Sequence, residues 1–148
     1  MRHLKILSII IVFLGILGNV YAQNTPLEEA SAYYRAFLMQ TKSGTNSEDM
    51  YYNLQNAYSR YCSVINAGAN YNVDEIRSAF KTMWPFMKSG AVYYSKKRQQ
   101  NRALFFAKAY IDIPSMDISK SDGYITDSYY PTLVYFAASG CYNSNDYR

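Results

Sequence analysis

The 148-residue sequence has one histidine, two cysteines, four prolines and no long apolar run beyond its N-terminal segment. The only histidine, His3, lies in a segment that we expect to be removed. The mature chain would then have no imidazole for acid–base catalysis or metal binding, which excludes Ser-His and Cys-His hydrolases and most zinc enzymes. Glycine-rich phosphate loops and the Gly-x-Ser-x-Gly and Ser-x-x-Lys motifs are also missing. We therefore expect no catalytic residue, no metal and no cofactor.

Residues 1–22 have the pattern of a cleaved signal peptide. Arg2 and Lys5 precede the apolar residues 6–17, and Val20 and Ala22 place small residues where a signal peptidase reads them. The run is too short to span a hydrocarbon core of ~30 Å. We expect cleavage after Ala22, export to the periplasm or medium, and no membrane span in the mature chain. Loss of the two cations leaves 13 basic and 11 acidic residues, so the formal net charge falls from +4 to +2.

Aromatic residues compensate for a scarcity of aliphatic ones. The sequence has 17 tyrosines, 7 phenylalanines and 1 tryptophan, and each aromatic side chain can bury roughly 150–250 Å². Apolar residues at helical spacing predict an all-α fold. The expected helices cover residues 26–42, 48–67, 73–84, 85–98, about 100–113 and 131–142, and residues 115–128 are expected to form a loop.

Capping and breaking residues set these boundaries. Pro85 is expected to divide residues 73–98 into two helices, and Pro114 to end the next one, because proline lacks an amide hydrogen. Gly68 is expected to end the second helix. The expected N-terminal caps are Thr25 in a capping box with Glu28, Ser47, and Asn72.

A fixed spacing of small, aromatic and proline residues lies in the middle of the chain. Gly90 and Tyr93 are three apart, Phe106 follows thirteen later, Ala109 three later and Pro114 five later. This spacing resembles the tetratricopeptide repeat, a 34-residue helical hairpin. In such a hairpin the small residues allow the two helices to approach closely, so a larger residue at position 90 would force them apart.

The resemblance extends beyond these positions. Phe86 occupies the usual tryptophan slot, whereas Ser89 and Arg102 depart from the family's leucine and alanine. Allowing for the loop at 115–128 as an insertion, Ala138 occupies the small-residue slot of the next unit. The resemblance implies a 23–46 N-terminal helix followed by antiparallel hairpins over 47–148, stacked as a short α-solenoid. Helices 48–67 and 73–84 would form one such hairpin, and the last hairpin would be incomplete, as in a truncated or longer parent protein.

Proteins of this family bind extended peptides or partner helices in a concave groove. Transferred to this sequence, the groove-facing positions are Trp84, Met87, Ala91, Tyr94, Thr132, Tyr135, Ser139, Tyr142 and Asn143. The implied function is an exported, non-catalytic scaffold for a protein or peptide partner. Two alternatives remain: a recognition module of a longer envelope enzyme, or a surface glycan-binding protein.

The other candidate sites have simpler interpretations. Cys62 and Cys141 would lie on helices two units apart, beyond disulfide reach, so free buried thiols are expected. The acidic residues of the 115–128 loop lack the glycine position and final glutamate of a calcium loop. The basic run 96–98 lies at a helix end, where a solvated turn is expected, so nucleic acid is not an expected partner.

Overall fold

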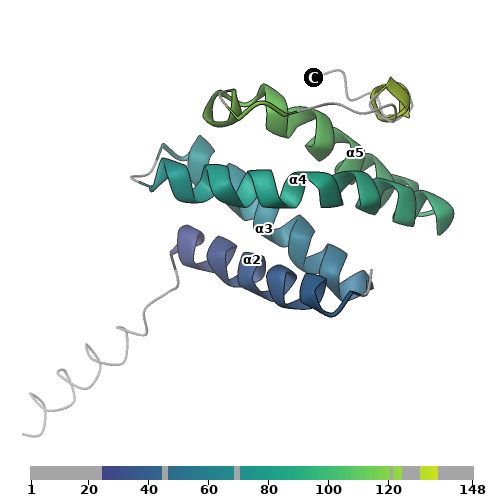
Figure 1. The fold of residues 1–148 in the computed structure, drawn as a ribbon, viewed down its shortest axis with the longest axis horizontal. Coiled ribbons are helices and arrows are strands. Elements are labelled where there is room, and N and C mark those ends of the chain that lie inside the picture. The colour runs from purple at the N-terminus through teal and green to yellow at the C-terminus, as the bar shows by residue number, and fades with distance from the viewer. Residues whose placement is uncertain (1–24, 45–46, 69–70, 121, 125–130, 137–148) are drawn as a thin grey trace, which may run out of the picture.

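The computed structural model describes residues 25–44, 47–68, 71–120, 122–124 and 131–136. Within these ranges the fold is all-α, as expected, and no strand occurs. The elements are α2 (Pro26–Lys42), α3 (Glu48–Asn66), α4 (Val73–Lys96), α5 (Gln100–Ser115), the short 3₁₀ helix η1 (Asp117–Ser119) and a helical segment at 131–136 (Figure 1). The expected signal peptide, Ala138, Ser139, Cys141, Tyr142 and Asn143 lie outside the described residues.

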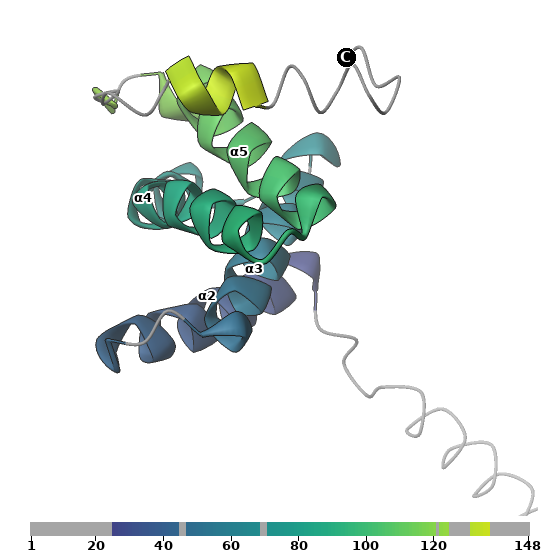
Figure 2. The ribbon, with the colours of Figure 1, turned by 90° about the vertical axis from the view of Figure 1, so that its right-hand side faces the viewer.

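The helices pair as two successive hairpins. α2 packs mainly against α3, and α4 packs mainly against α5, whereas the backbones of α3 and α4 approach closely at few points. Figure 2 shows the two pairs as layers, with α4 and α5 above α2 and α3. The expectation that helix 48–67 pairs with helix 73–84 is therefore wrong. The first helix is half of a hairpin with α3 and not a separate N-terminal element.

The expected helix starts are confirmed. Thr25 Oγ1 accepts a hydrogen bond from the Glu28 amide at 3.2 Å, and the Glu28 carboxylate accepts one from the Thr25 amide at 2.7 Å. Ser47 caps α3 by accepting a hydrogen bond from the Met50 amide, and Asn72 caps α4 by accepting from the amides of Asp74 and Glu75. Gly68 follows the end of α3 with φ = +61°, a conformation that glycine adopts without a Cβ clash.

The expected break at Pro85 is wrong, because α4 runs without interruption for 24 residues. Pro85 removes one helical hydrogen bond, but its ring lies on the exposed side of α4. Met83 and Met87, on either side of it, are both fully buried and fix both halves of the helix to the same core. Pro114 likewise lies within the last turn of α5, which ends at Ser115.

The close approach expected at Gly90 is present. A Cβ atom built on Gly90 would lie 2.8 Å from Cδ1 and Cγ of the Phe106 ring on α5. Real Cβ atoms do not come so close to a ring, so only glycine fits with the present separation of α4 and α5. Ala109 on α5 is also buried, and Tyr93 packs against the core.

Between the two hairpins, aromatic rings take the place of close backbone contact. Tyr51 of α3 lies 4.8 Å from Tyr93 and 5.7 Å from Phe106, measured between ring centroids. Phe37 of α2 meets Phe86 of α4 edge-on at 5.1 Å. We call this set the aromatic seam; it also includes Tyr58, which meets Phe80 and Phe105. The seam explains how a chain with few aliphatic residues forms a core.

Candidate functional site

Three of the residues expected in a groove lie in the core. Met87 is 0%, Tyr94 1% and Ala91 3% exposed. Tyr94 stacks on Phe106 at 5.5 Å and reaches the aromatic seam through its contact with Tyr51 at 5.8 Å. The resemblance implied that these side chains lie on an open surface. The structure instead buries Met87 and Tyr94 in the core, and the buried Ala91 lies at the edge of a surface depression described below.

Trp84 is half-buried and held by three contacts. Its ring stacks on Tyr110 with a centroid distance of 4.7 Å, and its Nε1 donates a hydrogen bond to the Tyr110 carbonyl at 2.8 Å. The Tyr124 ring meets it edge-on at 4.9 Å. The indole therefore joins α4, α5 and the segment that follows η1.

The expected groove residues that do reach the surface lie on the helical segment 131–136. Leu133 is buried, whereas Tyr135 is 75% exposed and Thr132 is exposed. Between this segment and the C-terminal half of α4 there is a depression of about 280 Å³, which we call the α4 depression. It is lined by Ala91, Val92, Ser95, Lys96, Thr132, Leu133 and Phe136.

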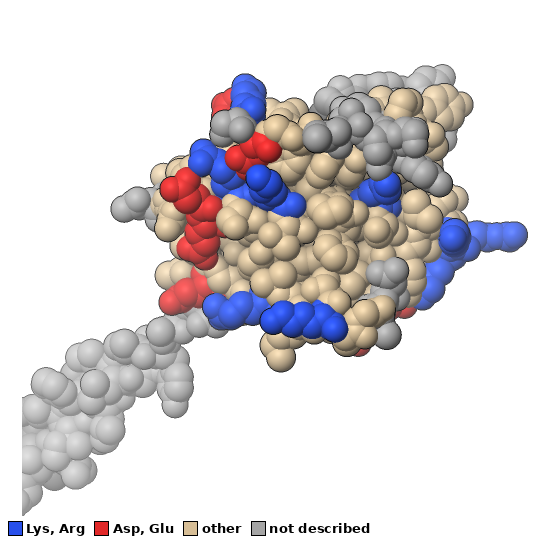
Figure 3. Space-filling model, in the orientation of Figure 1, with Lys and Arg blue, Asp and Glu red and all other residues tan. Residues whose placement is uncertain are grey.

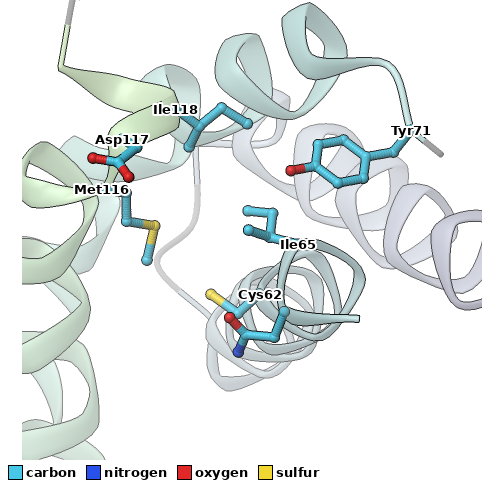
Figure 4. A pocket seen from close by; sticks show the side chains of 7 residues that line it. Cys62, Ile65, Tyr71, Met116, Asp117 and Ile118 are labelled. Atoms are coloured by element: carbon cyan, nitrogen blue, oxygen red, sulfur yellow. The ribbon is translucent and has the colours of Figure 1, made fainter. Parts of the chain in front are cut away.

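A second cavity, of about 400 Å³, lies near the other end of α4 (Figure 4). We call it the Cys62 cavity, and its walls come from three places in the chain. Cys62, Ile65 and Asn66 belong to the last turn of α3, Tyr71 precedes α4, and Met116, Asp117 and Ile118 follow α5. Sequence reasoning missed this site. The one local signal was the pair of apolar residues, Met116 and Ile118, in an otherwise polar loop.

Arg77 of α4 fixes the wall made by η1. Its Nε donates a hydrogen bond to the Ile118 carbonyl at 2.9 Å and lies 3.8 Å from Asp122 Oδ1. Its Nη1 pairs with Asp74 at 2.8 Å. The described start of the expected 115–128 loop is therefore attached to α4. Among the described residues, no group of three or more His, Cys, Asp and Glu side chains could hold a metal ion.

Cys62 has the thiol expected of a buried, unpaired cysteine. It is free and half-buried, and burial raises the pKa of its thiol to about 11. At neutral pH the thiol is therefore protonated, and a protonated thiol is a poor nucleophile and a poor metal ligand.

Charged side chains gather at the edges of the molecule. Acidic residues of the first turns of α2 and α4 lie at the left edge in Figure 3, and the middle of that face is largely uncharged. Near the α4–α5 turn, Glu48 pairs with Arg102 at 2.6 Å and with Lys97 at 3.3 Å. The same two cations lie over the rings of Tyr94 and Tyr93. Lys97 and Arg102 are thus paired with groups of the protein itself.

Comparisons with protein-family models, with curated proteins and with solved structures find no match to this chain. None of the described helices combines the length and the apolar character needed to cross a membrane.

Proposed function

We propose that this chain is an exported, non-catalytic scaffold whose helical hairpins bind a segment of a partner polypeptide. The observation that carries the proposal is the α4 depression, a hollow with mainly apolar lining residues, together with the 75% exposed side chain of Tyr135 on the same helical segment 131–136. Exposed tyrosines next to apolar hollows are frequent energetic centres of protein interfaces, because the ring buries a large area at a small cost in conformational entropy.

The chemistry of the site suits an uncharged, apolar stretch of polypeptide. Among its lining residues, Leu133 and Ala91 are buried and Val92 and Phe136 are half-buried. Among the described residues that line it, Lys96 is the one that carries a charge. A partner segment would place an apolar side chain in the hollow and lie against the Tyr135 ring. The tetratricopeptide-like spacing from Phe86 to Pro114 supports the same proposal, because α4 is the helix that such a repeat would turn toward its partner.

A peptide-display selection on the immobilised chain tests this function. Peptides that are enriched would then be titrated against the wild type, Tyr135→Ala and Tyr52→Ala. Tyr52 is the matched control because it is an exposed tyrosine, at 54%, on the other hairpin. We expect Tyr135→Ala to weaken binding by about tenfold or more, the range of an interface hot spot, and Tyr52→Ala to leave it unchanged. Equal affinity in all three proteins, or no enriched peptide, would count against the proposal.

Tyr94→Ala is not a useful binding variant. Tyr94 is 1% exposed and packed against Phe106, so its truncation is expected to cost several kcal/mol of stability, on the order of 3–5. Any loss of binding in that variant would then report unfolding.

A further inference from the structure

We infer that the Cys62 cavity is a second binding site, which takes a neutral, mainly apolar small molecule with one hydrogen-bonding group. The site is independent of the proposed polypeptide site. The η1 wall of the Cys62 cavity is attached to α4 at Arg77, whereas the first α4 residue that lines the α4 depression is Ala91. Those two positions are fourteen residues apart on α4, which corresponds to about 21 Å along the helix.

The size and the walls of the cavity suit a small ligand. Its volume of about 400 Å³ falls within the ~300–1,000 Å³ of ligand pockets. In Figure 4 the sulfur atoms of Cys62 and Met116 and the side chains of Ile65 and Ile118 face one common space. Sulfur-containing side chains are polarisable, and that of methionine is flexible, so these walls can adapt to an apolar guest.

The cavity is already formed without a ligand. The hydrogen bond from Arg77 to the Ile118 carbonyl, at 2.9 Å, holds the η1 wall on α4. Ile65, Tyr71 and Met116 are partly buried and pack against the core. A guest therefore does not have to order its own site, and preorganisation of this kind favours affinity.

The charges on the walls select a neutral guest. Asp117 is the one charged residue among the described lining residues. Its side chain is 94% exposed, pairs with Lys120 and points away from the cavity in Figure 4. An anionic guest would find no cation on these walls, and the desolvation of an ionised group without a partner is unfavourable.

Two described lining residues, Tyr71 and Asn66, carry uncharged hydrogen-bonding side chains. The Tyr71 hydroxyl points into the common space in Figure 4, and the Asn66 side chain also lines the cavity. A guest with a single hydroxyl or carbonyl group would satisfy one of these groups while its apolar part contacts the sulfur and isoleucine walls.

Calorimetric titration of the full chain with 1-naphthol tests the inference, and 1-naphthoate serves as a charged analogue with the same ring. We expect 1-naphthol to bind and 1-naphthoate to bind at least about tenfold more weakly. Met116→Trp fills the cavity and is expected to weaken 1-naphthol binding by at least about tenfold. Met39→Trp is the matched control, because Met39 is 73% exposed on α2, and it should bind like the wild type.

Nuclear magnetic resonance of the methionine methyl groups locates the guest in the unaltered protein. The Met116 methyl signal should shift on addition of 1-naphthol, and the Met39 signal should not. This measurement tests whether 1-naphthol binds in the Cys62 cavity even if Met116→Trp does not fold. The inference is overturned by any of three results: no binding of 1-naphthol, equal binding of 1-naphthoate, or an unmoved Met116 signal. Tyr135→Ala should leave 1-naphthol binding unchanged, so failure of the polypeptide proposal is distinguishable from failure of this one.

Discussion

Replacing Gly90 with alanine tests the close contact between α4 and α5. The new methyl group would lie 2.8 Å from two atoms of the Phe106 ring and 3.1 Å from a third. The ring cannot simply withdraw, because it is fully buried and packs against Tyr94 at 5.5 Å and Tyr51 at 5.7 Å. The substitution therefore forces a shift of α5 or of the aromatic seam.

Two opposing effects determine the change in the free energy of unfolding. Overpacking of a tight core costs about 1–3 kcal/mol. Alanine is favoured over glycine within a helix by about 1 kcal/mol. We therefore expect a net destabilisation of about 1 kcal/mol. In an open site the second effect would act alone and alanine would stabilise the protein by a similar amount, so the sign of the change tests the packing.

Urea denaturation followed by circular dichroism measures this change. Ser95→Ala, at an exposed position of the same helix, is the control and should be neutral or slightly stabilising. Adding Phe106→Leu to Gly90→Ala should recover part of the loss, with a coupling energy of roughly 0.5–3 kcal/mol. The reasoning is refuted if Gly90→Ala is as stable as the wild type or more stable.

Three further predictions concern charged, aromatic and thiol groups. Arg102 and Lys97 lower the pKa of Glu48. The ionised carboxylate therefore stabilises the fold at pH values above the ordinary glutamate pKa of about 4.3, and this stabilisation is lost as the pH falls below it. The melting temperatures of the wild type and Glu48→Gln should therefore converge in acid. Burial raises the pKa of Tyr51 to about 12, so stability is lost as the pH rises from about 10 toward that value, and Tyr51→Phe should resist alkaline unfolding better in circular dichroism. The Cys62 thiol has a raised pKa, so it should react slowly with a disulfide reagent at neutral pH and faster as the pH rises. The time course of absorbance after addition of the reagent to the Cys141→Ser protein measures this rate.

The helix boundaries were predictable because they depend on neighbours in the sequence. Thr25, Ser47 and Asn72 each hydrogen-bond to amides two or three residues later, so a short stretch of sequence contains the whole signal. The contact of Gly90 with Phe106 was predictable for another reason, the spacing typical of a known hairpin.

The pairing of the helices depends on information that the local sequence does not contain. α3 is joined to α2 and to α4 by connections of similar length, so loop length does not choose its partner. Pro85 had the signal of a helix end, but buried Met83 and Met87 outweigh the loss of one hydrogen bond. Tertiary packing thus overrides local preference at both places.

The candidate sites were less predictable than the fold. Tyr135 was expected at the surface and is exposed there, whereas Met87 and Tyr94 were expected beside it and are buried. The sequence pattern shows which residues share one face of α4, but whether that face is buried depends on the helices that pack against it. The Cys62 cavity was missed because its walls combine positions from 62 to 118.

The aromatic seam has a mechanical consequence. Inside the α4–α5 hairpin the helices approach closely and the Gly90 backbone lies against the Phe106 ring, whereas the two hairpins meet mainly through ring contacts such as Tyr51 with Tyr93. Ring contacts are short-ranged, so a small separation of the layers breaks many of them together. Under a stretching force the seam should yield first and release the hairpins as two cooperative units, each with its own protection against hydrogen exchange.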